Sequence, residues 1–125
     1  LAAAMQETRG RGFAAVRAQQ EELGRKVRAL FEGRGLPSVA AQGFQAPRVV
    51  VSYTSDPGLQ SGARFIAEGL QTAAGVPLQC DEGADFRTFR VGLFGLDKWQ
   101  HVDRTVGHLR AALDRIGVQA PAQVA

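Results

Sequence analysis

Arg90 is the residue whose type and setting point most directly to chemistry. It lies in the stretch Thr88–Phe94, whose apolar residues alternate with the period of a strand and are Phe89, Val91 and Leu93. Arg90 and Gly92 then fall on the opposite face, where the glycine leaves room for a small anion. A guanidinium keeps its charge and presents a planar fork of donors, so it suits bidentate binding of a carboxylate. The residues alone leave a second interpretation open, which is an ordinary exposed strand arginine.

The other polar clusters favour structural interpretations. His101 and His108 stand seven positions apart on an expected helix, which puts them on one face but two turns apart. That separation is too long for both to bind one metal ion without a third ligand between them, so we expect surface side chains and no metal site. Asp81, Glu82 and Asp85 lack the ligand spacing of a calcium loop and are predicted to form a solvated turn.

The single cysteine, Cys80, excludes an internal disulfide and suits a reducing, cytoplasmic compartment. The acidic residues Asp81 and Glu82 follow it directly, and their charges disfavour the thiolate that a nucleophile needs. The chain also has no GxxxxGK[ST], HExxH, CxxC or GxSxG motif. The usual self-contained catalytic motifs are therefore absent.

A long amphipathic helix is predicted from Thr8 to Phe31. Its apolar positions recur at helical spacing and are Phe13, Val16, Leu23, Val27, Leu30 and Phe31. Gln20 is the one polar break in this stripe. The expected charged face consists of Arg17, Glu21, Glu22, Arg25 and Arg28. Gly33, Gly35 and Pro37 are expected to end the helix.

The remaining pattern predicts a small sheet covered by helices. Valine-rich residues 48–54 and residues 88–94 predict strands, and residues 76–80 predict a short extended piece. A helix capped by Ser55 or Asp56 is expected to run to residue 73, with its apolar stripe formed by Leu59, Ala63, Ile66 and Leu70.

A last helix is predicted to begin at a capping box of Asp97 and Gln100 and to stop at Gly117. Its apolar positions are Trp99, Val102, Val106, Leu109, Leu113 and Ile116. Residues 118–125 are expected to form a frayed tail. The order of elements predicts an α/β fold, a two-layer sandwich with a sheet of about three strands.

Length and composition indicate one folded domain. The chain has 125 residues, of which 45% are hydrophobic and 22% charged, as in ordinary globular proteins. No apolar run approaches the roughly 18 residues of a membrane-spanning helix, so we expect no membrane partner. Residues 1–50 carry a net charge of +4 and the remainder −1. Because glutamates interrupt the arginines of the first segment, we expect no nucleic-acid partner.

A family resemblance adds to the interpretation of Arg90. The run from Thr88 to Gly95, followed by Asp97, Val102-Asp103-Arg104 and the stretch 109–113, resembles the C-terminal signature of class V aminotransferases. These are pyridoxal-phosphate enzymes of the alanine–glyoxylate and serine–pyruvate type, in which an F-R-[IV]-G-x-x-G strand and turn precede a final helix. The loop 81–85 has no counterpart in this signature.

The resemblance implies a small α/β domain of a fold-type I pyridoxal-phosphate enzyme. Residues 1–36 would be a connecting helix, residues 37–117 the small domain, and residues 118–125 the tail. In the family this domain supplies the arginine that binds the substrate α-carboxylate, which carries over to Arg90 alone. Neither Lys26 nor Lys98 matches the cofactor lysine, which is expected upstream of Leu1 in a large domain absent from this chain.

The implied function is transamination between an amino acid and a 2-oxo acid such as glyoxylate or pyruvate, by a homodimeric enzyme in which this part alone is inactive. The amino donor and acceptor stay open. Two alternatives also remain: a lyase or desulfurase of the same superfamily, and a non-catalytic small α/β module that binds amino acids or, weakly, nucleic acid. The second would use the basic first helix and the run Arg9-Gly10-Arg11-Gly12-Phe13.

Overall fold

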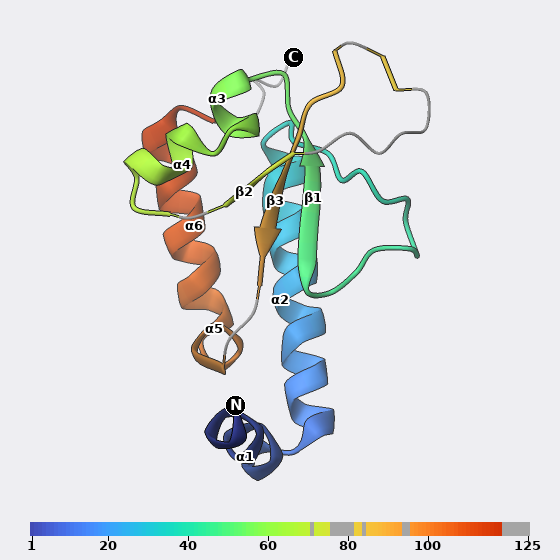
Figure 1. The fold of residues 1–125 in the computed structure, drawn as a ribbon, viewed down its shortest axis with the longest axis vertical. Coiled ribbons are helices and arrows are strands. Elements are labelled where there is room, and N and C mark those ends of the chain that lie inside the picture. The colour runs from blue at the N-terminus through green and yellow to red at the C-terminus, as the bar shows by residue number, and fades with distance from the viewer. Residues whose placement is uncertain (71, 76–81, 84, 94–95, 119–125) are drawn as a thin grey trace, which may run out of the picture.

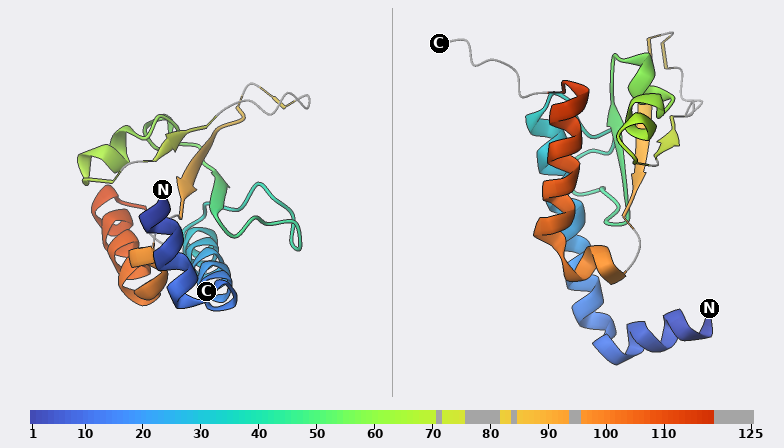
Figure 2. Two further views of the ribbon diagram at one scale, coloured as in Figure 1. Left: turned by 60° about the horizontal axis from the view of Figure 1, so that its bottom comes forward. Right: turned by 90° about the vertical axis from the view of Figure 1, so that its left-hand side faces the viewer.

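The computed structural model describes residues 1–70, 72–75, 82–83, 85–93 and 96–118 (Figure 1). In chain order the elements of this part are α1 (Ala2–Arg11), α2 (Phe13–Gly33), β1 (Val49–Tyr53), α3 (Pro57–Gln60), α4 (Ala63–Ala67), β2 (Ala73–Ala74), β3 (Thr88–Gly92), α5 (Leu96–Gln100) and α6 (Val102–Ile116). The long helices α2 and α6 lie side by side in one layer, and the sheet forms the other (Figure 2). The predicted α/β class and two-layer architecture are confirmed.

The sheet is antiparallel throughout, in the order β1-β3-β2. Residues 37–39 extend it on the free side of β1, where Tyr53 N donates to Pro37 O at 2.9 Å and Val39 N to Val51 O at 3.0 Å. The strands predicted at 48–54 and 88–94 are confirmed over Val49–Tyr53 and Thr88–Gly92. The extended piece predicted at 76–80 lies outside the described residues.

Three phenylalanines from different elements meet in the core. Phe89 of β3 packs edge-on against Phe31 of α2, with ring centroids 5.4 Å apart, and packs with a tilted ring against Phe65 of α4, with centroids 5.3 Å apart. All three side chains are fully buried. Such aromatic pairs add to the stability gained by burying their area, so this contact ties both layers together.

Gln20, the polar break in the apolar stripe of α2, makes a structural contact. Gln20 is buried, and its Nε2 donates to Pro47 O at 2.9 Å. One turn further, the backbone of Gly24 lies so close to Pro47 that a Cβ would stand 2.7 Å from the same carbonyl oxygen. The side of α2 that carries Gln20 and Gly24 therefore contacts the chain at Pro47, just before β1.

Arg28 continues this contact, and its predicted position on the charged face is wrong. The side chain is buried, and its guanidinium donates to Val49 O at 2.9 Å and also to Ala46 O. Removal from water lowers the pKa of Arg28 below its ordinary value. The sequence pattern could not reveal this because the partners are main-chain carbonyls, which leave no trace in residue type.

Glycine divides two of the predicted helices. The helix expected from Thr8 is interrupted at Gly12, whose φ of +85° belongs to the left-handed region, so α1 and α2 run in different directions (Figure 2). Likewise, Gly62 at φ +84° separates α3 from α4. The register then changes: Phe65 is buried and Ile66 is 64% exposed, so the stripe predicted through Ile66 is wrong.

The start of the last helix also differs from the prediction. Asp97 lies inside the short helix α5 and not at its N-cap, and α6 begins only after His101. The Asp97 carboxylate instead accepts from Arg104 of α6. The predicted stop at Gly117 is confirmed, with φ +95°. Val118 packs against the core, while residues 119–125 lie outside the described part.

Candidate functional site

Arg90 lies at the centre of β3 and faces away from α2 and α6. Its neighbour Phe89 is fully buried in the core, and alternation along the strand sends Arg90 the other way. Arg90 stands directly opposite Val51 of β1 and Ala73 of β2. Residues paired in this way share one face of a sheet. The predicted orientation of Arg90 therefore holds in the structure.

We call this side of the sheet the outer face. It consists of Val49, Val51, Tyr53, Ala73, Thr88, Arg90 and Gly92. The helices α2 and α6 both cover the opposite side (Figure 2). Apart from Arg90, the outer face as defined here carries no charged residue.

The Arg90 side chain is half-buried and anchored at one point. Its Nε donates to Ala74 O of the edge strand β2 at 3.3 Å. Its two terminal nitrogens donate to no other residue in the described part of the chain. A guanidinium fixed through Nε still offers the paired terminal donors that a carboxylate engages. The hydrogen bond from Nε thus orients the guanidinium and leaves its two terminal nitrogens available to a ligand.

Arg90 differs from many basic residues of the chain in its ion pairing. Ion pairs with acidic side chains are formed by Arg17, Lys26, Arg34, Arg64, Arg104 and Arg115. Between Arg90 and the described acidic residues there is no such pair. A half-buried cation without an acid partner gains more from binding an external anion than an exposed one does, because water screens it less.

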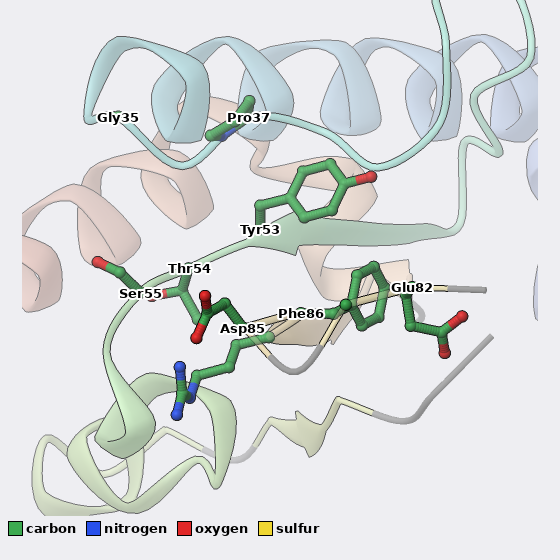
Figure 3. Close-up of a pocket in the computed structure, with 10 residues that line it drawn as sticks. Gly35, Pro37, Tyr53, Thr54, Ser55, Glu82, Asp85 and Phe86 are labelled. Carbon is green, nitrogen blue, oxygen red and sulfur yellow. The ribbon is translucent and has the colours of Figure 1, made fainter. Parts of the chain in front are cut away.

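A cavity of about 590 Å³ opens at the end of β1, next to the outer face (Figure 3). The rings of Tyr53 and Phe86 meet edge-on beside it, with centroids 5.8 Å apart. Glu82 and Asp85 line the same cavity, so part of the loop predicted as a solvated turn borders a hollow. No motif in the sequence predicts this cavity, and its one signal there is the alternation that places Tyr53 on the face of Arg90.

No protein-family model matches this sequence, and a search of curated proteins finds no match.

Lys26 of α2 and Lys98 of α5 both lie in the helical layer, away from the outer face that carries Arg90 (Figure 2). Lys26 Nζ contacts Asp103 at 2.7 Å and Glu22 at 3.0 Å on the helical surface. Hydrogen bonds to these two carboxylates raise the pKa of Lys26, whereas a lysine that attacks a carbonyl must lose its proton. Lys98 lies in α5, on the far layer from the outer face. The described residues do not fit this cofactor by themselves.

The other predicted residues stay apart from Arg90. His101 and His108 are both exposed, at the start of α6 and two turns along it. Among the described residues no three histidine, cysteine or acidic side chains come together as a metal site. Cys80 lies outside the described residues. The helices of the described part include none long and apolar enough to cross a membrane.

Proposed function

We propose that this chain is the small domain of a pyridoxal-phosphate-dependent aminotransferase, in which Arg90 binds the carboxylate of an amino acid or a 2-oxo acid such as glyoxylate or pyruvate. One observation carries the proposal: Arg90 stands alone as a charge on the outer face, anchored through Nε, with its terminal donors turned to no described residue. The signature around Arg90 supports the same assignment.

The surroundings of Arg90 favour a small organic acid over a larger polyanion. Val51 and Ala73 pair with Arg90 on the neighbouring strands, so they lie on the same face and would offer an apolar contact to the carbon atoms next to a bound carboxylate. A charge-assisted hydrogen bond contributes roughly 1.5–3 kcal/mol, and a paired arrangement fixes the ligand's orientation as well. Arg90 would therefore fix both the position and the direction of the carboxylate.

Such an anchor has a clear role in transamination. Bound pyridoxal phosphate would supply the electron sink, and the residues that hold the substrate would decide which bond of its α-carbon is presented to the cofactor. A carboxylate held by Arg90 restricts rotation about that carbon. In this proposal the cofactor and its lysine are supplied by polypeptide other than the residues described, since Lys26 and Lys98 do not fit that task.

The test is steady-state kinetics of the protein in which this domain is joined to its cofactor-binding domain. Arg90→Ala is expected to lower kcat/KM for the amino acid by tens-fold or more, mainly through KM, because removal of one partner of a charged pair costs roughly 2–5 kcal/mol. Cofactor absorbance is expected to persist. Arg110→Ala, an exposed arginine of α6, is the matched control. Unchanged kinetics in Arg90→Ala would overturn the proposal.

A second measurement uses the 125-residue chain alone. Titration with pyridoxal phosphate is expected to produce no stoichiometric visible absorbance band, because Lys26 Nζ contacts Asp103 and Glu22 on the helical surface and Lys98 also lies in the helical layer, away from Arg90. A stoichiometric band that disappears in Lys26→Met or Lys98→Met would show that this domain holds the cofactor itself. That result would contradict the assignment as a small domain.

A further inference from the structure

A second cavity lies beside the C-terminal end of β3, and Arg90 is not among the described residues that line it. It has a volume of about 360 Å³ and lies between the end of β3 and the helices α5 and α6. We call it the α6 cavity. Its apolar wall is formed by core residues, among them Val27, Leu93 and Leu109, which are all buried. Pockets of 300–1,000 Å³ with mostly apolar walls and a few polar groups are typical of small-molecule sites.

Positive charge gathers at the rim of the α6 cavity. The cationic residues Lys98 of α5 and Arg104 of α6 line it, together with His108 of α6, and Asp97 is the one acidic residue among its described lining residues. Arg104 and His108 stand one helical turn apart, so they share a face of α6. The rim thus favours an anionic group over a neutral or cationic one.

Arg104 keeps donors available at this rim. One of its terminal nitrogens donates to both carboxylate oxygens of Asp97, at 2.8 Å each. Its remaining nitrogens donate to no other residue within the described part. The Asp97 contact holds the guanidinium in place beside the apolar wall. Thr72 also lines the cavity, and its buried hydroxyl oxygen has no hydrogen-bond partner among the described residues.

We propose that the α6 cavity binds a small amphipathic carboxylate, with its hydrocarbon body against Val27, Leu93 and Leu109 and its carboxylate at Arg104 and His108. An apolar wall that ends in a cationic rim matches such a molecule in both parts. The site is separate from Arg90, which is not among the described residues that line the cavity. The inference is independent of the proposed function.

The experiment is calorimetric titration of the full chain with octanoate, compared with acetate and with octan-1-ol. Octanoate is expected to bind with one-to-one stoichiometry and more tightly than either comparison ligand, because acetate lacks the hydrocarbon body and octanol lacks the charge. Equal affinities for octanoate and octanol would overturn the proposal, and so would equal affinities for octanoate and acetate.

Variants locate the binding. Arg104→Gln is expected to weaken octanoate binding about tenfold, the equivalent of one charge-assisted hydrogen bond. Arg110→Gln changes an exposed arginine of the same helix that does not line the cavity and is expected to leave affinity unchanged. Thr105→Trp places a large ring at the cavity wall from a partly exposed position and is expected to abolish binding.

The two sites can be told apart with Arg90→Ala. That variant is expected to bind octanoate like the wild type, whereas it should lose binding of short acids at the outer face. Octanoate binding that is lost in Arg90→Ala but kept in Arg104→Gln and Thr105→Trp would overturn the α6 cavity as the site. Circular dichroism of each variant checks that the helices are retained.

Discussion

The carbonyl oxygen of Pro47 lies against the backbone of Gly24, where a Cβ would approach it to 2.7 Å. Gln20 Nε2 donates to the same oxygen at 2.9 Å. This contact holds the chain against α2 just before it enters β1. The position of β1 determines where β3 pairs, and therefore where Arg90 is presented.

Gly24→Ala is expected to destabilise the fold by about 1–3 kcal/mol, the usual effect of overpacking against backbone that cannot move aside. The intrinsic gain of alanine over glycine in a helix, about 1 kcal/mol, works against this loss and does not cancel it. Urea unfolding measures the difference. Gly33→Ala in the same helix meets nothing within 4 Å and should be neutral or stabilising. Equal effects of the two substitutions would contradict the close packing.

Arg28→Met is expected to lower stability by about 1–3 kcal/mol, because the carbonyl oxygens of Ala46 and Val49 lose their donor. Methionine keeps an unbranched apolar stem and removes a buried charge, which offsets part of the loss. Arg25→Met, at an exposed position of α2, serves as the control and should change stability by no more than about 0.5 kcal/mol. A gain in stability from Arg28→Met would show that these hydrogen bonds do not stabilise the fold.

The pair formed by Lys26 of α2 and Asp103 of α6 predicts a pH dependence. Its hydrogen bond, 2.7 Å between Nζ and Oδ1, holds the pKa of Asp103 below its ordinary value, and the carboxylates of Asp103 and Glu22 raise the pKa of Lys26. An acid whose pKa is lowered in the folded state stabilises the fold at pH values above its unfolded-state pKa. It loses that effect as the pH falls through its folded-state pKa. A base whose pKa is raised in the folded state stabilises the fold at pH values below its unfolded-state pKa, and it loses that effect as the pH rises through its folded-state pKa.

Asp103→Asn should therefore cost stability between the ordinary pKa values of aspartate and lysine, and the difference from wild type should vanish at both extremes. The effect is small because both side chains are exposed to solvent and screened. Urea unfolding at a series of pH values measures it, with Glu7→Gln on the exposed helix α1 as a control for lost charge. A difference that stays constant into strong acid would exclude this pair as its source.

Periodicity predicted those parts of the fold in which neighbours along the chain decide the outcome. The alternation of Phe89, Val91 and Leu93 gave the correct face for Arg90, and the valine run gave β1. The helix ending at Gly117 followed from the same local reasoning, since glycine accepts a positive φ without strain.

The parts that were wrong depend on contacts between distant residues. Gly62 is compatible with a helix in sequence, but the fold uses it to turn Phe65 onto Phe89. β2 pairs only two alanines with β3, and alanine favours helices, so the local sequence did not predict this strand. For the same reason it did not predict that the carbonyl of Ala74 would accept a hydrogen bond from Arg90. The sequence thus predicted the face of the sheet on which Arg90 lies, but not the residue that anchors its side chain.

The most direct test of the central claim is an NMR titration that follows the Nε–Hε signal of Arg90, assigned by its loss in Arg90→Lys. Pyruvate is expected to shift this signal saturably with a dissociation constant on the order of 10–100 mM, as one charge-assisted contact of roughly 1.5–3 kcal/mol gives. Uncharged pyruvamide should leave it in place, and Arg110→Ala should respond like the wild type. An Arg90 signal that pyruvate does not move, or that pyruvamide moves equally, would contradict carboxylate binding at this residue.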